Sequence, residues 1–561
     1  MTQPSVAPPP VQTRLFQRHW TWWFMVAVLV VVAAVRLRLL NFPLERDEGE
    51  YAYAGQLMLQ GIPPYQLAYN MKFPGTYAAY AAIMVLFGQT PASIHFGVLC
   101  MTTLTALMLF WLGNQILDWT AGMVAATFHA VMAASPSMLG LSGHATHFAA
   151  FFATAGLCAM WRTRQNGQGL MVMTSGLLFG AAVLMKQPAA LIALWAAMVF
   201  AVTHIRRTET PIGKRLRAIV TFGTGIILPF ALCCLVLWRA GVFEKFWFWT
   251  IDYARQYASI VPIAESPRFF RVGVGHVIAA NYSLWLIAAG GLVLIWFDER
   301  LQKNRGWLLS FSLASALSVC PGFYFRKHYF LLLLPALALL AGCAVSGLRR
   351  LWNERSHPSQ LGDWPVWGYG LMVAATMLVN RDIWFVQTPT QVSRTTYGAD
   401  PFPEAQLAAS YIRANSSPEA HVAILGSEPE IYFLSQRHSA TGYIYTYGLM
   451  EPQPFARQMQ SEMIREIETD APEFVIFVDD IMSWWRYPDS DLRIFDWWNS
   501  YRTNYTLVAL SDVISPTETI NAWGTNAIAH YGVAHGSALE IYQRKADPLS
   551  PQTPSPSVKR P

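Results

Sequence analysis

The residues best suited to chemistry lie in Glu45–Tyr51, directly after the first long apolar run. Asp47 and Glu48 stand there among further carboxylates and one arginine, in a chain with only 13% charged residues. One interpretation is a solvated loop at a membrane boundary. The other is a catalytic carboxylate just outside the bilayer, because such a group can remove the proton of an attacking hydroxyl or amine. In an extended loop successive side chains point in opposite directions, so only one of the two can face the substrate.

Cations that could meet a phosphate group lie in two later segments. Lys72 comes two residues before a proline, and a second group, Arg326, Lys327, His328 and Tyr329, opens an apolar run. Such charges are often ordinary loop or topology signals. At an outer membrane boundary they could instead neutralise a phosphate leaving group, as cations do in phosphate sites.

Aromatic residues and one arginine alternate in Trp247–Tyr257, which follows another apolar run. This pattern is typical of an interfacial aromatic anchor. The functional alternative is a platform for a lipid phosphate and a sugar, in which Tyr253 and Arg255 would take part.

Two further polar segments allow either a structural or a functional interpretation. His144 and His147 have a spacing that suits metal binding, but no third ligand is close in sequence, so polar residues at the end of a span are favoured. Lys186, in Met185–Pro188, is interpreted first as a helix end and second as a site residue.

The elements that must position these residues are membrane spans. The chain has 561 residues, of which 53% are hydrophobic, and its 22 Trp and 23 Tyr suit two interfacial aromatic belts. Its net charge of +6 is scattered through loops without a basic stripe, which excludes nucleic acid as the expected partner. About eleven transmembrane helices are predicted, in Trp20–Leu40, Ile94–Gly113, Ala121–Met138, Thr146–Trp161, Leu170–Met185, Ala189–His204, Ile219–Leu237, Asn281–Phe297, Trp307–Val319, Tyr329–Gly347 and Trp367–Val379.

The distribution of positive charge orients these spans. Four connecting loops carry clusters of arginine and lysine, and such loops stay cytoplasmic. Alternation then puts 41–93 and everything after Asn380 outside, provided that Pro74–Gly88 does not cross the membrane. That short apolar run could also be a twelfth span or a helix at the interface. Residues 1–19 are predicted to be a disordered cytoplasmic tail.

Residues 381–546 change character and predict a small extracytoplasmic α/β domain. His421–Leu425 and Phe474–Val478 are expected as buried strands, and Glu404–Asn415 and Pro454–Glu468 as amphipathic helices. The Pro-rich tail, 547–561, is predicted to be disordered.

The order of several motifs resembles the GT-C membrane glycosyltransferases, and most of all the bacterial protein O-mannosyltransferase branch with the lipid A aminoarabinose transferase. A first span, the Asp47-Glu48 pair and Lys72-Phe73-Pro74 follow one another as in that family. Gly180–Lys186 and His328–Leu331 are also similar. The resemblance covers residues 20–380, which would form the transmembrane catalytic domain.

The resemblance implies that Asp47 is the catalytic base, that Lys72 contacts phosphate, and that a polyprenyl phosphate carries the sugar. This chain departs from the family pattern in the second outer loop. An acidic residue is usual there, whereas this chain has His144 and His147.

These observations predict a multi-pass enzyme of the bacterial inner membrane. It would move a hexose or pentose from a polyprenyl-phosphate donor to a lipid, glycan or protein acceptor on the outer face. Inversion is favoured because no second acidic residue is evident across the sugar. No cofactor is required, and a divalent cation is left open. The alternative is a transporter or lipid-carrier flippase, although no internal repeat is visible and the polar residues gather at one face.

Overall fold

Each of the eleven apolar runs folds as a helix in the computed structural model of the chain. The structure describes residues 11–166, 169–355, 362–531 and 536–545. The helices of the first part are α1 (Val11–Arg38), α2 (Arg46–Leu59), α3 (Gly75–Phe87), α4 (Pro91–Ile116), α5 (Trp119–Ala133), α6 (Ala145–Asn166), α7 (Gly169–Met185), α8 (Ala190–Ile205), α9 (Ile212–Arg239), α10 (Phe243–Trp247), α11 (Ala254–Ser259), α12 (Ser266–Ala279), α13 (Tyr282–Leu294), α14 (Glu299–Gln302), α15 (Arg305–Leu317), α16 (Leu334–Arg355) and α17 (Trp364–Val379). Short 3₁₀ or π turns interrupt them at η1 (Pro136–Met138), η2 (Gln187–Ala189), η3 (Phe248–Tyr253), η4 (Lys327–Leu332) and η5 (Asp382–Val386).

Five of the described helices are long and apolar enough to cross a membrane by themselves. The pair α12 and α13 adds a sixth if its halves, bent by 109°, form one broken span. Four shorter apolar helices, α3, α5, α7 and α17, complete this group. The chain is thus a multi-pass helical membrane protein. α3 corresponds to the run Pro74–Gly88, and its 13 residues span roughly 20 Å, less than the hydrocarbon core of a bilayer.

The predicted N-terminal tail, 1–19, overlaps helix α1. α1 begins at Val11, so the second half of the segment 1–19 is helical. Prolines end at Pro10, and the residues that follow are compatible with a helix that continues into the first span. Residues 1–10 and the predicted tail 547–561 lie outside the described residues.

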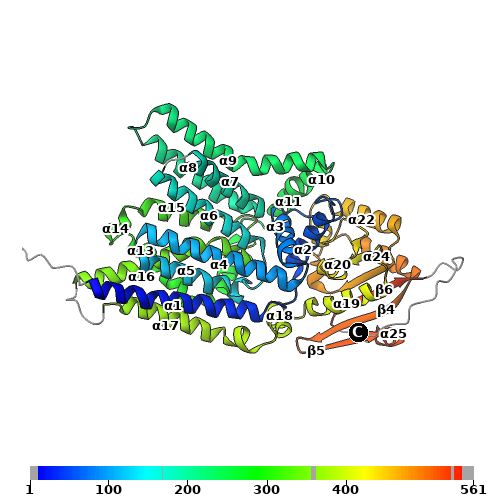
Figure 1. Ribbon diagram of the computed structural model, residues 1–561. Helices are drawn as coiled ribbons and strands as arrows, with labels where there is room; N and C mark the ends of the chain where they lie inside the picture. The colour runs from blue at the N-terminus through cyan, green and yellow to red at the C-terminus, as the bar shows by residue number, and fades with distance from the viewer. Residues whose placement is uncertain (1–10, 167–168, 356–361, 532–535, 546–561) are drawn as a thin grey trace, which may run out of the picture.

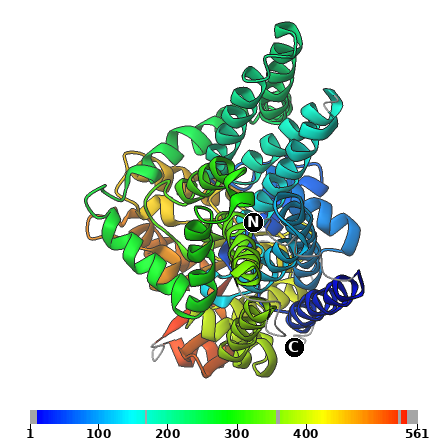
Figure 2. The ribbon, with the colours of Figure 1, turned by 90° about the vertical axis from the view of Figure 1, so that its left-hand side faces the viewer.

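The α/β domain forms at one end of the helical bundle (Figure 1). Its elements are α18 (Pro389–Tyr397), α19 (Phe402–Asn415), β1 (His421–Leu425), α20 (Glu430–Ser435), β2 (His438–Ser439), α21 (Tyr447–Met450), α22 (Ala456–Asp470), β3 (Phe474–Asp479), α23 (Ile481–Trp484), α24 (Arg493–Tyr501), η6 (Arg502–Asn504), β4 (Tyr505–Ser515), β5 (Glu518–Trp523), α25 (Thr525–Tyr531) and β6 (Ser537–Arg544). The strands and helices predicted here are confirmed, with ends that differ by at most a few residues. Figure 2 views the bundle from the opposite end, with this domain behind the helices.

The six-stranded sheet has the order β2-β1-β3-β6-β4-β5. β1 pairs in parallel with β2 and β3, whereas β6 runs antiparallel to β3 and β4. β1 and β3 are almost entirely buried, as their continuous apolar sequences require. The loops after these two strands reach the first turn of α2.

Candidate active site

The predicted catalytic stretch is the first turn of helix α2, not an extended loop. Glu45 caps this helix, because its side chain accepts a hydrogen bond from Glu48 N, while Glu48 Oε2 accepts one from Glu45 N. A helix turns by about 100° per residue, so neighbouring side chains leave it in different directions. The charged side chains of Glu45–Glu50 therefore point in different directions.

Asp47 faces a cavity, whereas Glu48 does not. Glu48 is 0% exposed, and its Oε1 accepts hydrogen bonds from Gly143 N at 2.5 Å and pairs with His95 Nε2 at 3.0 Å. Glu48 therefore ties α2 to α4 and to the start of α6.

Lys72 is held by two carboxylates. Its Nζ lies 2.7 Å from Asp47 Oδ1 and 2.6 Å from Glu50 Oε2, and the Glu50 carboxylate also accepts hydrogen bonds from Asn70 and Tyr77. Burial alone would lower the pKa of Lys72, but the two carboxylates raise it above its usual range. Burial would likewise raise the pKa of Asp47, and Lys72 holds it well below its usual range. Both groups are thus charged.

The cavity has a volume of about 520 Å³ and lies between the helical bundle and the α/β domain. Side chains from several separate parts of the chain line it. They include Asp47, Tyr51 and Lys72; Lys186 and Gln187; Trp249, Tyr253, Arg255 and Tyr257; Arg326, His328 and Tyr329; and Tyr445, Tyr447 and Glu451.

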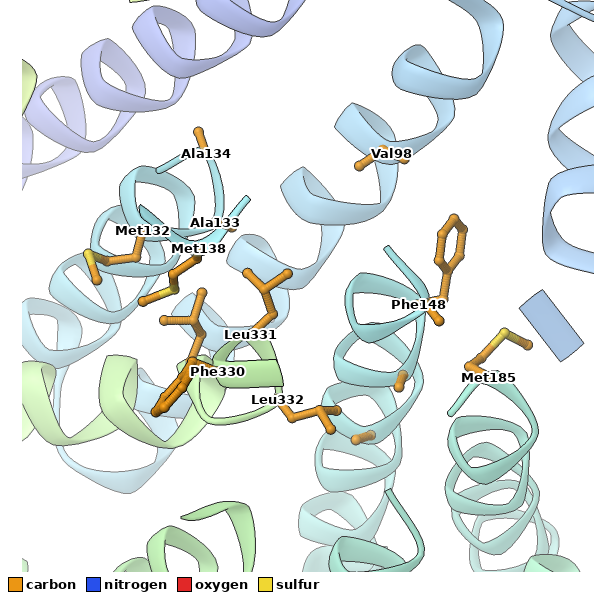
Figure 3. Packing of buried hydrophobic residues seen from close by; sticks show 14 of the residues in the cluster. Val98, Met132, Ala133, Ala134, Met138, Phe148, Met185, Phe330, Leu331 and Leu332 are labelled. Carbon is orange, nitrogen blue, oxygen red and sulfur yellow. The ribbon is translucent and has the colours of Figure 1, made fainter. Parts of the chain in front are cut away.

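Helix η4 is held in place by its apolar side chains. Phe330, Leu331 and Leu332 are buried in one cluster with Met138 and Phe148, next to the ends of α5 and α6 (Figure 3). With these residues directed into the core, the preceding His328 and Tyr329 line the cavity.

Two cations of the cavity wall, Lys186 and Arg326, make no ion pair within the described chain. Lys186 Nζ lies over the ring of Tyr329, 4.5 Å from its centroid, and Arg326 lies over the ring of Tyr324 at 5.3 Å. Burial lowers the pKa of Lys186 to about 7. Aromatic rings therefore hold both cations while their charges stay available to an anion.

Aromatic side chains of the helical bundle and of the α/β domain line the cavity together. Tyr253 OH donates to Glu451 Oε2 at 2.6 Å, and Tyr257 stacks on Tyr324 with ring centroids 4.8 Å apart. Burial raises the pKa of Glu451 to about 7, against the opposing effects of Tyr253 and Arg326. Tyr445 OH reaches Asp47 Oδ1 at 3.4 Å.

Asp47, His144 and His328 are close enough together to bind one metal ion. The rings of His144 and His328 stack with centroids 4.2 Å apart, and ligand atoms of Asp47, His144 and His328 all lie within 4.8 Å of one another. Among the described residues, neither nitrogen of His144 has a hydrogen-bond partner, nor has Nδ1 of His328. His144 Nδ1 lies 3.6 Å from Glu45 Oε1 and 3.8 Å from Asp47 Oδ2. Burial keeps the pKa of His328 well below its usual range, so this imidazole is neutral. Two imidazoles and a carboxylate suit zinc or a similar divalent ion.

The structure brings most of the predicted site residues together. Seven of the nine line the cavity: Asp47, Lys72, Tyr253, Arg255, Arg326, His328 and Tyr329. Glu48 and Lys327 are not among its lining residues. Sequence reasoning placed Lys186 and His144 at helix ends first, and it did not single out Glu50, Tyr445 or Glu451. The last two come from the α/β domain, and no local motif marks them.

Comparisons with known proteins identify the fold. No protein-family model and no curated protein sequence matches the chain. The solved structures that match include ArnT from Cupriavidus metallidurans bound to undecaprenyl phosphate, at 14% identity with a TM-score of 0.56, covering 95% of this chain and 99% of that one. The archaeal oligosaccharyltransferase AglB from Archaeoglobus fulgidus, in complex with an inhibitory peptide and a dolichol-phosphate, matches at 14% identity and a TM-score of 0.51, covering 91% and 75%. Both are GT-C enzymes, so the predicted GT-C fold is confirmed.

Proposed function

We propose that this GT-C-fold chain is a membrane glycosyltransferase that moves a sugar from a polyprenyl-phosphate donor to an acceptor. The observation that carries the proposal is the lining of the cavity. An ionised carboxylate, Asp47, lies there together with two basic side chains that form no ion pair with a described residue, Lys186 and Arg326. The matched structures of ArnT and AglB contain undecaprenyl phosphate and dolichol-phosphate, which supports a donor of this class.

Asp47 is the proposed general base. A hydroxyl or amine of the acceptor attacks the anomeric carbon while the bond from that carbon to the phosphate oxygen breaks. The proton of the acceptor passes to Asp47, and the electron pair leaves with the lipid phosphate. Lys72 keeps Asp47 ionised and in place.

Lys186 and Arg326 are the proposed contacts of the leaving phosphate, and Arg255 adds positive charge at the exposed edge of the cavity. This assignment revises the role that the sequence suggested for Lys72, because its ammonium is already shared by two carboxylates. Cations placed where negative charge develops stabilise the transition state. The rings of Trp249, Tyr253 and Tyr257 offer the sugar a stacking surface.

A divalent cation would be held by Asp47, His144 and His328. When bound, it would supply a further positive charge for the phosphate.

Inversion is the proposed stereochemistry. Glu451 is a second carboxyl in the cavity, which the sequence did not reveal, but its contact is with Tyr253. No hydrogen bond or ion pair of the described residues joins it to Asp47 or Lys72. A single displacement with Asp47 as base fits this arrangement, and it inverts the anomeric carbon.

We further propose that the enzyme resides in a bacterial inner membrane with its α/β domain outside the cell membrane and residues 20–380 as the catalytic membrane domain. The four loops rich in arginine and lysine support this orientation, because such loops usually stay cytoplasmic. A reporter fused after Asn380 should be active only on the outer side, and cytoplasmic activity would contradict the proposed topology.

The decisive experiment uses membranes with labelled polyprenyl-phosphate sugars. Covalent transfer of the label to a lipid, glycan or protein, with the opposite anomeric configuration by NMR, is expected. Movement of intact donor across the bilayer without transfer would instead support a flippase or transporter.

A further inference from the structure

Arg46 points away from the cavity and into the α/β domain. Its guanidinium donates to Glu428 Oε1 from Nε at 3.1 Å and from NH2 at 2.8 Å. NH2 also reaches Asp400 at 3.1 Å and Asp480 at 3.4 Å. Arg46 is buried, so these are desolvated contacts in which one arginine faces three carboxylates of one domain.

The backbone of α2 meets the same domain beside this group. A side-chain carbon at Gly49 would lie only 2.4 Å from the backbone nitrogen of Glu430. Gly49 thus allows α2 to approach the segment after β1 more closely than any larger residue would.

The first turn of α2 is therefore held from two sides. Lys72 contacts Asp47 from the cavity side, and Glu428 contacts Arg46 from the domain side. Because the two held residues are consecutive, a shift of Arg46 must move Asp47.

We propose that Arg46 is a positioning residue, through which Glu428 of the α/β domain sets the position of Asp47 in the cavity. This inference rests on the proposed function, in which Asp47 is the base. The α/β domain would then contribute to catalysis by holding the base in place. Proton transfer depends on the exact reach of the base, and a displacement of about 1 Å can cost roughly a hundredfold in rate.

The neighbouring Glu430 provides a matched control. It lies two residues after Glu428, is equally buried, and forms no ion pair in the described part of the chain. Burial and the charge of Glu428 raise the pKa of Glu430 well above its usual range, so this residue is neutral. Burial raises the pKa of Glu428 to about 7, against the opposing charge of Arg46, so its carboxylate is ionised above that pH. At pH 8, Glu430→Gln should therefore preserve the site, whereas Glu428→Gln removes the charge that faces Arg46.

The test compares single-turnover transfer in purified, full-length Glu428→Gln, Arg46→Lys and Glu430→Gln proteins. Turnover should fall by about tenfold to a hundredfold in the first two variants, as expected for a misplaced base. Donor affinity should be unchanged in them, and Glu430→Gln should behave as wild type. Wild-type turnover in Glu428→Gln would overturn the proposal.

A double-mutant cycle separates positioning from a general loss of structure. If Glu428 acts through Asp47, then Asp47→Asn together with Glu428→Gln should be no slower than Asp47→Asn alone. Losses that multiply would show that Glu428 acts independently of Asp47 and would overturn the proposal. Full activity of Asp47→Asn by itself would instead refute the proposed function.

Discussion

Lys72 Nζ lies 2.7 Å from Asp47 Oδ1, and the same nitrogen lies 2.6 Å from Glu50 Oε2. The lysine that the sequence suggested for a phosphate thus bridges two carboxylates of α2. Its ammonium neutralises part of the negative charge of Asp47 and Glu50, which would be costly to bury without a cation. It also holds the side chain of Asp47 in place at the cavity.

Replacing Lys72 by Met should lower both turnover and thermal stability, while donor affinity changes little. The variant leaves two buried carboxylates without their cation, and losing such a contact typically costs ~1.5–3 kcal/mol. Melting curves and donor binding should be measured on the same preparation. A large loss of donor affinity with an unchanged melting temperature would restore the phosphate role of Lys72.

Arg326→Gln should raise the donor KM about tenfold or more, because the variant loses a charge-assisted contact worth ~1.5–3 kcal/mol. Its neighbour Lys327 is not among the lining residues of the cavity, so Lys327→Gln is the matched control and should leave the donor KM unchanged. Equal effects of the two substitutions would mean that only the overall positive potential of this segment matters.

Donor binding should depend on pH through Lys186. Burial lowers the pKa of Lys186 to about 7, so the ammonium is present below that pH and lost above it. Only the charged form attracts phosphate, and affinity should therefore fall above pH 7, by at most about tenfold per pH unit for one proton. Arginine stays charged, so Lys186→Arg should flatten this dependence between pH 6 and 9. A profile that is the same in both proteins would exclude Lys186.

Much of the architecture could be predicted because its signals are local. Apolar runs mark the helices, and the buried strands β1 and β3 contain the continuous hydrophobic sequences 422–425 and 474–478. Asp47 could be found from the density of carboxylates at a membrane boundary. The helical state of this stretch has no clear local signal, because the N-cap of its capping box is Glu45 and not one of the usual Ser, Thr, Asp or Asn residues.

The partners of these charges could not be predicted, because they depend on tertiary contacts. Glu451 and Tyr445 lie some 400 positions from Asp47 in the chain, and no periodicity connects them to it. Similarly, Lys186 follows a helix, and only the folded structure shows that its ammonium lies over Tyr329 and forms no ion pair with a described carboxylate.

Single-turnover transfer by Asp47→Asn shows whether Asp47 removes the acceptor proton. The amide keeps the shape of the side chain but cannot accept the proton, so turnover should fall by ~10²–10⁴-fold, the usual contribution of general base catalysis. Donor affinity should remain, and Glu48→Gln should lose less activity, because Glu48 faces His95 and Gly143 instead of the cavity. Near-wild-type turnover in Asp47→Asn would contradict the account.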